Sequence, residues 1–262
     1  MRTSSNPAFR ALSGKGQGQG GYANFGYQGQ QPTGYGYPAA PPTAADRPMT
    51  IDDVVTKTAT ALGTTIVVGG VTAYLGLHPL FALAAGLVGM VLAFVITFRQ
   101  STNPALVLTY AAVEGVFLGT ITKVIDYLVP GVAVQAIVGT LVVFATMLVL
   151  YRTGAVKVTP RLTKWIIGAT MGAFALVVFN LLLSLFHVDL GVRGNGPLAI
   201  IVSLLFIGIA AFNLLLDFDQ ADRAIRAGAP ARFAWYIAFG LMVTLVWLYV
   251  EILNLLAQLQ RN

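Results

Sequence analysis

The amino-acid sequence predicts an all-α integral membrane protein, built as a bundle of seven transmembrane helices. Of its 262 residues, 56% are hydrophobic and only 10% are charged, whereas a soluble globular domain carries about 25% charged residues. The apolar residues form seven blocks, and a helix of about 20 such residues crosses a bilayer. Proline and glycine separate the blocks, as expected of connections between helices.

Residues 1–48 differ in composition from the rest of the chain, because Gly, Gln, Tyr and Pro dominate positions 14–42. Such a composition cannot bury a hydrophobic core. We therefore expect a disordered cytoplasmic tail at 1–48, or alternatively a partner-binding segment that acts through its tyrosines. The membrane domain should occupy residues 49–262, and Thr50 is a candidate cap for its first helix.

The seven blocks can be assigned in order from their connections. Small residues four positions apart, as in Gly115-Gly119 and Gly168-Gly172, would allow close helix packing inside two of them. The separating motifs are His78-Pro79, Asn103-Pro104, Pro130-Gly131, Pro160, Gly196-Pro197 and Gly228-Ala229-Pro230. The blocks are predicted at 56–76, 79–98, 104–123, 130–151, 164–187, 197–217 and 233–257.

Basic residues concentrate in alternate connections, those after the second, fourth and sixth blocks. By the positive-inside rule the amino terminus is cytoplasmic and the carboxyl terminus lies outside a cell membrane. The net charge of +6 therefore indicates topology, and we expect no nucleic-acid partner. The basic residues of these connections are Arg99, Arg152, Lys157, Arg161, Lys164, Arg223, Arg226 and Arg232.

The sequence contains little that would support catalysis. It has no cysteine, which excludes disulfides and thiolate chemistry. Its two histidines, His78 and His187, lie at block ends, and neither a nucleophile elbow nor a phosphate-binding loop is present. We predict that the protein is not an enzyme and carries no cofactor, apart from a candidate bound Ca²⁺.

Polar residues form a stripe on each of the last two blocks, at alternating steps of three and four residues that place them on one helix face. Such groups are costly in lipid, so both stripes should face the protein interior or water. Two antiparallel helices could then bring two carboxyl groups together in a proton- or cation-sensitive site. The stripes are Ser203, Phe206, Ala210, Asn213, Asp217 and Gln220, and Thr244, Trp247, Glu251, Asn254 and Gln258.

Three acids and three amides are the candidate functional groups of the apolar blocks. Glu114 lies near the middle of the third block, and Glu251 lies deep in the seventh. Asp217 ends the sixth block, so the alternative to a functional role is that Asp217 simply belongs to a solvated helix end. Alternatively, Glu114 and the amides form hydrogen bonds between helices. The candidate cation path is Glu114, Asn180, Asn213 and Asn254, the candidate gate is Asp217 and Glu251, and the secondary candidates are Asp219 and Arg99.

Four short motifs, in order along the chain, resemble those of the Bax inhibitor/YccA family, also called the transmembrane Bax inhibitor motif family. The start of the chain is similar to a bacterial branch with a long amino-terminal tail. The four motifs are Glu114-Gly115-Val116-Phe117-Leu118-Gly119, Phe179-Asn180, Leu216-Asp217-Phe218-Asp219-Gln220 and Leu248-Tyr249-Val250-Glu251-Ile252-Leu253-Asn254.

The resemblance implies a bundle with the last helix central, acting as a pH-sensitive calcium leak in the bacterial inner membrane. Two acids of the family share a proton at the gate, and they map to Asp217 and Glu251, which could also bind Ca²⁺. Here the second acid is Glu rather than Asp, and 34 residues separate the two. If the last helix starts at Phe233, Glu251 lies about 27 Å along it, and Glu114 becomes the alternative partner.

Two hypotheses of function follow. The first is a cation leak channel or exchanger gated by carboxylates in the membrane, with lipid, calcium and protons as its partners. The second is a membrane regulator without transport activity, which binds a membrane protease or another membrane protein.

Overall fold

The computed structural model describes residues 47–184, 186, 191–192, 194 and 196–261. The predicted tail therefore lies outside the described residues, except for its last two positions. Among the described residues, seven helices are long and apolar enough to cross a membrane. They are α2 (Ile51–Leu75), α3 (Leu80–Arg99), α4 (Pro104–Leu128), α5 (Val132–Thr153), α6 (Pro160–Ser184), α7 (Pro197–Arg226) and α8 (Ala234–Arg261).

The predicted fold class is confirmed, and local signals explain where several helices begin. Thr50 caps α2 in a reciprocal capping box with Asp53, which satisfies two backbone N–H groups. Asn103 caps α4 directly before Pro104, because its side chain accepts a hydrogen bond from Ala105 N. Proline at the first helical position lacks only an N–H that would have had no partner in the helix.

Helix α7 is longer than its predicted block, which ended at Asp217. It continues to Arg226 because its charged residues pair within the helix. Arg223 Nη2 lies 2.6 Å from Asp219, and Arg226 Nη2 lies 2.7 Å from Asp222. Such i,i+4 pairs support a helix outside an apolar environment. A short 3₁₀ turn, Ala231–Phe233, then leads into α8.

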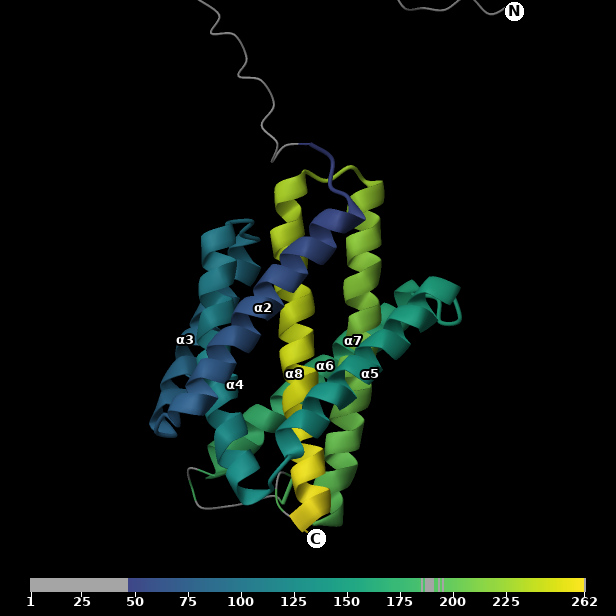
Figure 1. The fold of residues 1–262 in the computed structure, drawn as a ribbon. Helices are drawn as coiled ribbons and strands as arrows, with labels where there is room; N and C mark the ends of the chain where they lie inside the picture. Colours follow the sequence, from purple (N-terminus) through teal and green to yellow (C-terminus); the bar gives the residue numbers. More distant parts are fainter. Residues whose placement is uncertain (1–46, 185, 187–190, 193, 195, 262) are drawn as a thin grey trace, which may run out of the picture. The chain divides into compact units, whose positions relative to one another are not determined.

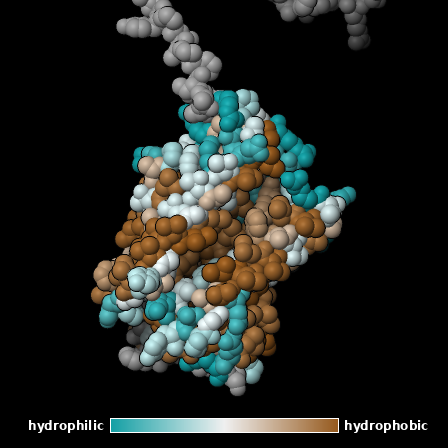
Figure 2. Space-filling view, viewed as in Figure 1, coloured by the Kyte–Doolittle hydropathy of each residue, from teal (hydrophilic) through white to brown (hydrophobic). Residues whose placement is uncertain are grey.

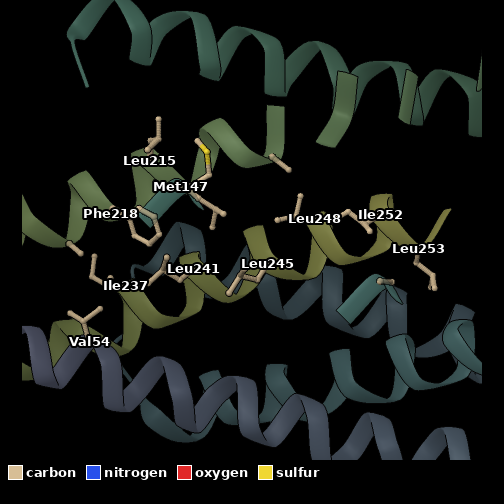
Figure 3. Close-up of a cluster of buried hydrophobic side chains, with 14 of the residues drawn as sticks. Val54, Met147, Leu215, Phe218, Ile237, Leu241, Leu245, Leu248, Ile252 and Leu253 are labelled. Atoms are coloured by element: carbon tan, nitrogen blue, oxygen red, sulfur yellow. The ribbon is translucent and has the colours of Figure 1, made fainter. Parts of the chain in front are cut away.

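Helix α8 is the central helix of the bundle. In its most apolar window 61% of the residues are buried, compared with at most 39% in any other spanning helix. Figure 1 shows α8, in yellow, between α2 and α4 on one side and α7 on the other. Figure 3 labels Leu241, Leu248 and Ile252 along α8. These side chains belong to the same buried hydrophobic cluster as Met147 of α5 and Phe218 of α7. The predicted central position of the last helix is therefore confirmed.

The outside of the bundle is apolar, as expected of a surface in contact with lipid. Figure 2 shows a broad hydrophobic band across the helices, with hydrophilic residues gathered toward both ends. Large apolar side chains such as Val67, Phe98 and Trp165 are exposed on α2, α3 and α6. In water this surface would aggregate, so the chain is a multi-pass membrane protein.

The segment before α2 is attached to the connection between α7 and α8. Met49 N donates to Ala229 O at 2.7 Å, and Ala231 N donates to Arg47 O at 2.7 Å. Lys57 of α2 reaches the same connection, where its Nζ donates to Ala231 O. Among the described residues, contacts with the membrane domain are therefore present from Arg47 onward.

Candidate functional site

Asp217 is half-buried, and its carboxyl group contacts α8. Thr244 Oγ1 donates to Asp217 Oδ2 at 2.6 Å. Gly240 lies one turn before Thr244, and a Cβ at that position would be 3.8 Å from Asp217 Oδ1. Nine further residues of α7 follow Asp217, which is about 13 Å of helix. The alternative that Asp217 sits in a solvated helix end required it to lie at the end of α7, and it does not.

The polar stripes of α7 and α8 face each other, and the two helices run antiparallel. Two contacts between them agree on one pairing of positions and so define the register. Gln258 Nε2 donates to Ser203 Oγ at 3.4 Å, so this contact lies 14 residues from the Asp217–Thr244 contact along both helices. The same register places Glu251 at the level of Ala210. Glu251 thus lies two turns, about 10 Å, along α8 from the level of Asp217.

This register corrects the predicted meeting of Asp217 and Glu251. The neighbour of the Asp217 carboxyl group is the Thr244 hydroxyl, and Glu251 is deeply buried two turns away, with 2% of its surface exposed. The offset is smaller than the 27 Å expected from the sequence because α7 continues beyond Asp217. Proton sharing between the two acids stays a prediction, without direct contact in its support.

Glu114 of α4 is directed toward α3. A Cβ at Gly89 of α3 would lie 3.0 Å from Glu114 Oε1, so the missing side chain provides the space for the carboxyl group. Glu114 is buried, and its Oε2 has no hydrogen-bond partner among the described residues. An unpaired carboxyl oxygen in such a place is costly. The site therefore suits a water molecule, a proton or a cation.

Contacts between α4 and α8 show that Glu114 is also far from the level of Glu251. Near one end of the interface, Thr65 Oγ1 of α2 contacts both Ala111 O at 3.0 Å and Met242 Sδ at 3.5 Å. Further along, the hydroxyl groups of Thr122 and Tyr249 lie 2.9 Å apart. The two helices therefore run in the same direction. Glu114 lies near the level of Asp217 and Thr244, so a direct contact with Glu251 is not supported either.

The three amides have different surroundings. Asn213 Nδ2 donates to Thr170 Oγ1 of α6 at 2.7 Å and to Ile209 O at 2.9 Å. Asn213 therefore joins two helices, which was the alternative to its place in the cation path. Asn180 lies ten residues beyond Thr170 on α6, about 15 Å away along that helix. Its buried Oδ1 has no described partner.

Asn254 lies near the carboxyl-terminal end of α8, beside a small cavity. The cavity has a volume of about 90 Å³ and is bordered by Asn254, Gln258 and Arg261 of α8 and by the end of α4. Gln258 Oε1 is buried and has no described hydrogen-bond partner. These amides form the polar end of a series that runs along α8 from Thr244 through Glu251.

The secondary candidates are separate from the Asp217 site. Asp219 pairs with Arg223 at 2.6 Å, and Arg99 is exposed at the end of α3. Ca²⁺ takes six to eight oxygen ligands at about 2.3–2.6 Å, and the described residues contain no cluster of three or more acidic or histidine side chains. With Glu251 about 10 Å along α8 from the Asp217 level, the described arrangement lends no support to a calcium site shared by these two acids, which stays a prediction.

Sequence reasoning placed Thr244 on the polar stripe but did not identify it as the partner of Asp217. It also missed Gly89, whose small size leaves room for the Glu114 carboxyl group, and Gly240, which lies beside Asp217. A glycine in an apolar helix is too common to have indicated either role.

A family model described as Bax inhibitor 1 like matches residues 6–261. The match covers nearly the whole chain and includes all four motifs that resembled this family. No curated protein matches the chain.

Proposed function

The chain belongs to the Bax inhibitor 1 like family, and on that premise we propose that it is a calcium leak pathway whose opening depends on pH. The observation that carries this proposal is the contact of Asp217 with Thr244, which joins α7 to the central helix within the bundle. A titratable group at a helix interface can change the packing of that interface when it gains or loses a proton.

The proposed path follows the polar face of α8. It runs from the Asp217–Thr244 contact, past Glu251, to the small cavity beside Asn254 and Gln258. Between these levels the helices are closed by apolar side chains, since Leu214 and Leu248 are completely buried. The described arrangement is therefore a closed state, and conduction requires α7 and α8 to separate.

The state of Asp217 supplies the proposed pH dependence. When protonated, the carboxyl group is neutral and its hydrogen bond with Thr244 suits an apolar interface. When ionised, it needs water or a cation, because an isolated charge is costly away from water. Raising the pH should therefore favour separation of α7 and α8 and the entry of a cation, for which carboxylate oxygens are suitable ligands.

Glu251 and Glu114 have different proposed roles. Glu251 is the next acid along the path, so a passing cation would be attracted to it after Asp217. Glu114 lies at about the same level as Asp217 but in the contact between α3 and α4, beside Gly89. Its charge would act on the cation through space rather than by direct coordination.

The test is calcium uptake into liposomes that contain the full chain, measured with an enclosed dye between pH 6 and pH 8. Uptake by the unchanged protein should increase with pH. Asp217→Asn keeps the acceptor for Thr244 but cannot ionise, so its uptake should not vary with pH. Asp52→Asn removes an exposed carboxylate at the start of α2 and should leave the pH dependence unchanged.

Two results would contradict the proposal. If Asp217→Asn keeps the full pH dependence, Asp217 is not the titrating group. If the folded, unchanged protein shows no cation uptake at any pH, the protein is not a leak pathway. The regulator that binds a membrane protease or another membrane protein would then be the function to test.

A further inference from the structure

A groove with a volume of about 1190 Å³ separates α2 from α5 and has α7 and α8 at its base. This α2–α5 groove is larger than the pockets that hold most small ligands, which have about 300–1,000 Å³. In Figure 2 the surface in this region belongs mainly to the hydrophobic band. Its apolar lining includes Val54, Val55 and Leu62 of α2, Phe144 and Leu148 of α5, and Phe218 of α7.

One end of the groove is basic. Arg152, Lys157, Arg223 and Arg226 line it, together with Asp219 and Asp222. The two acids are already paired with Arg223 and Arg226 within α7. Among the residues that the structure describes, Arg152 and Lys157 form no ion pair. Two positive charges are thus left for an anion at the end of an apolar groove.

Two polar side chains, Thr58 and Tyr151, also line the groove. Thr58 lines the groove with only 8% of its surface exposed, and its hydroxyl has no hydrogen-bond partner among the described residues. A buried hydroxyl without a partner is unfavourable. Tyr151 also lines the groove, and its hydroxyl donates to Asp222 Oδ2 at 3.3 Å. The Tyr151 hydroxyl therefore lies at the basic end of the groove, beside Asp222.

We propose that the α2–α5 groove binds an anionic phospholipid. The phosphate lies between Arg152 and Lys157, and an acyl chain follows the apolar lining toward Leu62 and Phe144. Most of the lining belongs to membrane-spanning helices and the rest to the connection after α5, so a lipid would enter the groove from the bilayer, and basic pockets between such helices suit anionic headgroups. The chain's own tail is a poorer occupant, because positions 14–42 are rich in Gly and Gln.

The lipid position adjoins the proposed gate but does not depend on it. Phe218 of the groove follows Asp217 directly, and Leu241 follows Gly240. A bound acyl chain would therefore pack beside the Asp217–Thr244 contact. Because the test below measures lipid binding and not ion flux, it can fail or succeed whatever the outcome of the calcium experiment.

The test is native mass spectrometry of the full chain in detergent, with phosphatidylglycerol or phosphatidylcholine of identical acyl chains. The unchanged protein should retain phosphatidylglycerol preferentially. Replacing both cations, Arg152→Gln with Lys157→Gln, should weaken its binding about tenfold and remove the preference. The matched control is Arg161→Gln with Lys164→Gln, in the same basic region but outside the groove lining, and it should keep the preference.

A second variant tests the apolar part. Ala59 of α2 is exposed and lines the groove, so Ala59→Trp can fill the groove without disturbing the core, and it should reduce binding of phosphatidylglycerol. Equal binding by the control and groove variants would overturn the proposal. So would displacement of the lipid by millimolar inorganic phosphate, which would show an anion site only. Stronger lipid binding after removal of residues 1–46 would make the tail the occupant.

Discussion

The contact between α2 and α4 and the contact between α7 and α8 hold helices together in opposite ways. Helices α2 and α4 pack backbone against backbone, because a Cβ at Gly119 would collide with the carbonyl oxygen of Gly69, and one at Gly115 would lie 2.8 Å from Thr65 O. Helices α7 and α8 pack through buried apolar side chains such as Leu214 and Leu248, and they also share polar side-chain contacts, as in the 2.6 Å contact of Thr244 with Asp217.

The difference indicates which part of the bundle can move. Close backbone packing has no alternative arrangement at small cost, because interiors are dense and a shifted helix would clash. A polar contact can be exchanged for water when a proton or cation arrives. We therefore expect α2 and α4 to form the more rigid part of the bundle, and the proposed opening to take place at the α7–α8 interface.

The largest expected effect is from Gly119→Leu, which should prevent α2 and α4 from packing. Overpacking a core costs about 1–3 kcal/mol and sometimes more, and here the new side chain meets backbone that cannot turn away. We expect a strong loss of folded protein and a much lower melting temperature in detergent.

The matched control is Gly168→Leu in α6. Gly168 belongs to the same small-residue pattern in the sequence, but nothing lies within 4 Å of a Cβ at that position. This variant should fold and melt like the unchanged protein. Similar damage from both substitutions would show that the α2–α4 contact is not specially intolerant.

A smaller effect is expected from Thr244→Val, which keeps the shape of the side chain but removes its hydroxyl group. Asp217 then loses its hydrogen bond, and because Asp217 is only half-buried we expect a cost toward the lower end of the about 1–3 kcal/mol for a buried polar group left without a partner. Thr140→Val is the control, because Thr140 is equally buried but bonds only to Ala136 O in its own helix. If both variants lose the same stability in detergent, the Asp217 contact has no special importance for the α7–α8 interface.

The smallest effect concerns the segment that links the two regions. Deletion of residues 1–46 should leave the melting temperature unchanged, since the contacts described here begin at Arg47. Deletion of residues 1–49 should lower it, because Met49 is buried, with 2% of its surface exposed, and donates to Ala229 O at 2.7 Å. Equal melting of the two shortened proteins would mean that this attachment does not stabilise the α7–α8 connection.

The number of spanning helices and the family could be predicted from the sequence because both depend on local features. Length and apolarity decide whether a segment crosses a bilayer, and the motifs around Glu114 and Glu251 are continuous in the chain. Helix ends were less predictable. The block that was predicted to end at Asp217 continues to Arg226 because Asp219 and Asp222 form ion pairs along the helix, which a hydropathy pattern does not show.

By itself, the sequence determined that the protein spans a membrane with seven helices, that its tail differs in composition from the membrane domain, and that Asp217 and Glu251 each lie on a polar helix stripe. Only the tertiary structure decided which groups meet. Helical periodicity specifies the face of a side chain, but the register between two helices depends on how their side chains and glycines pack. That register placed Thr244 beside Asp217 and kept Glu251 two turns away. The groove between α2 and α5 likewise depends on how separate helices pack.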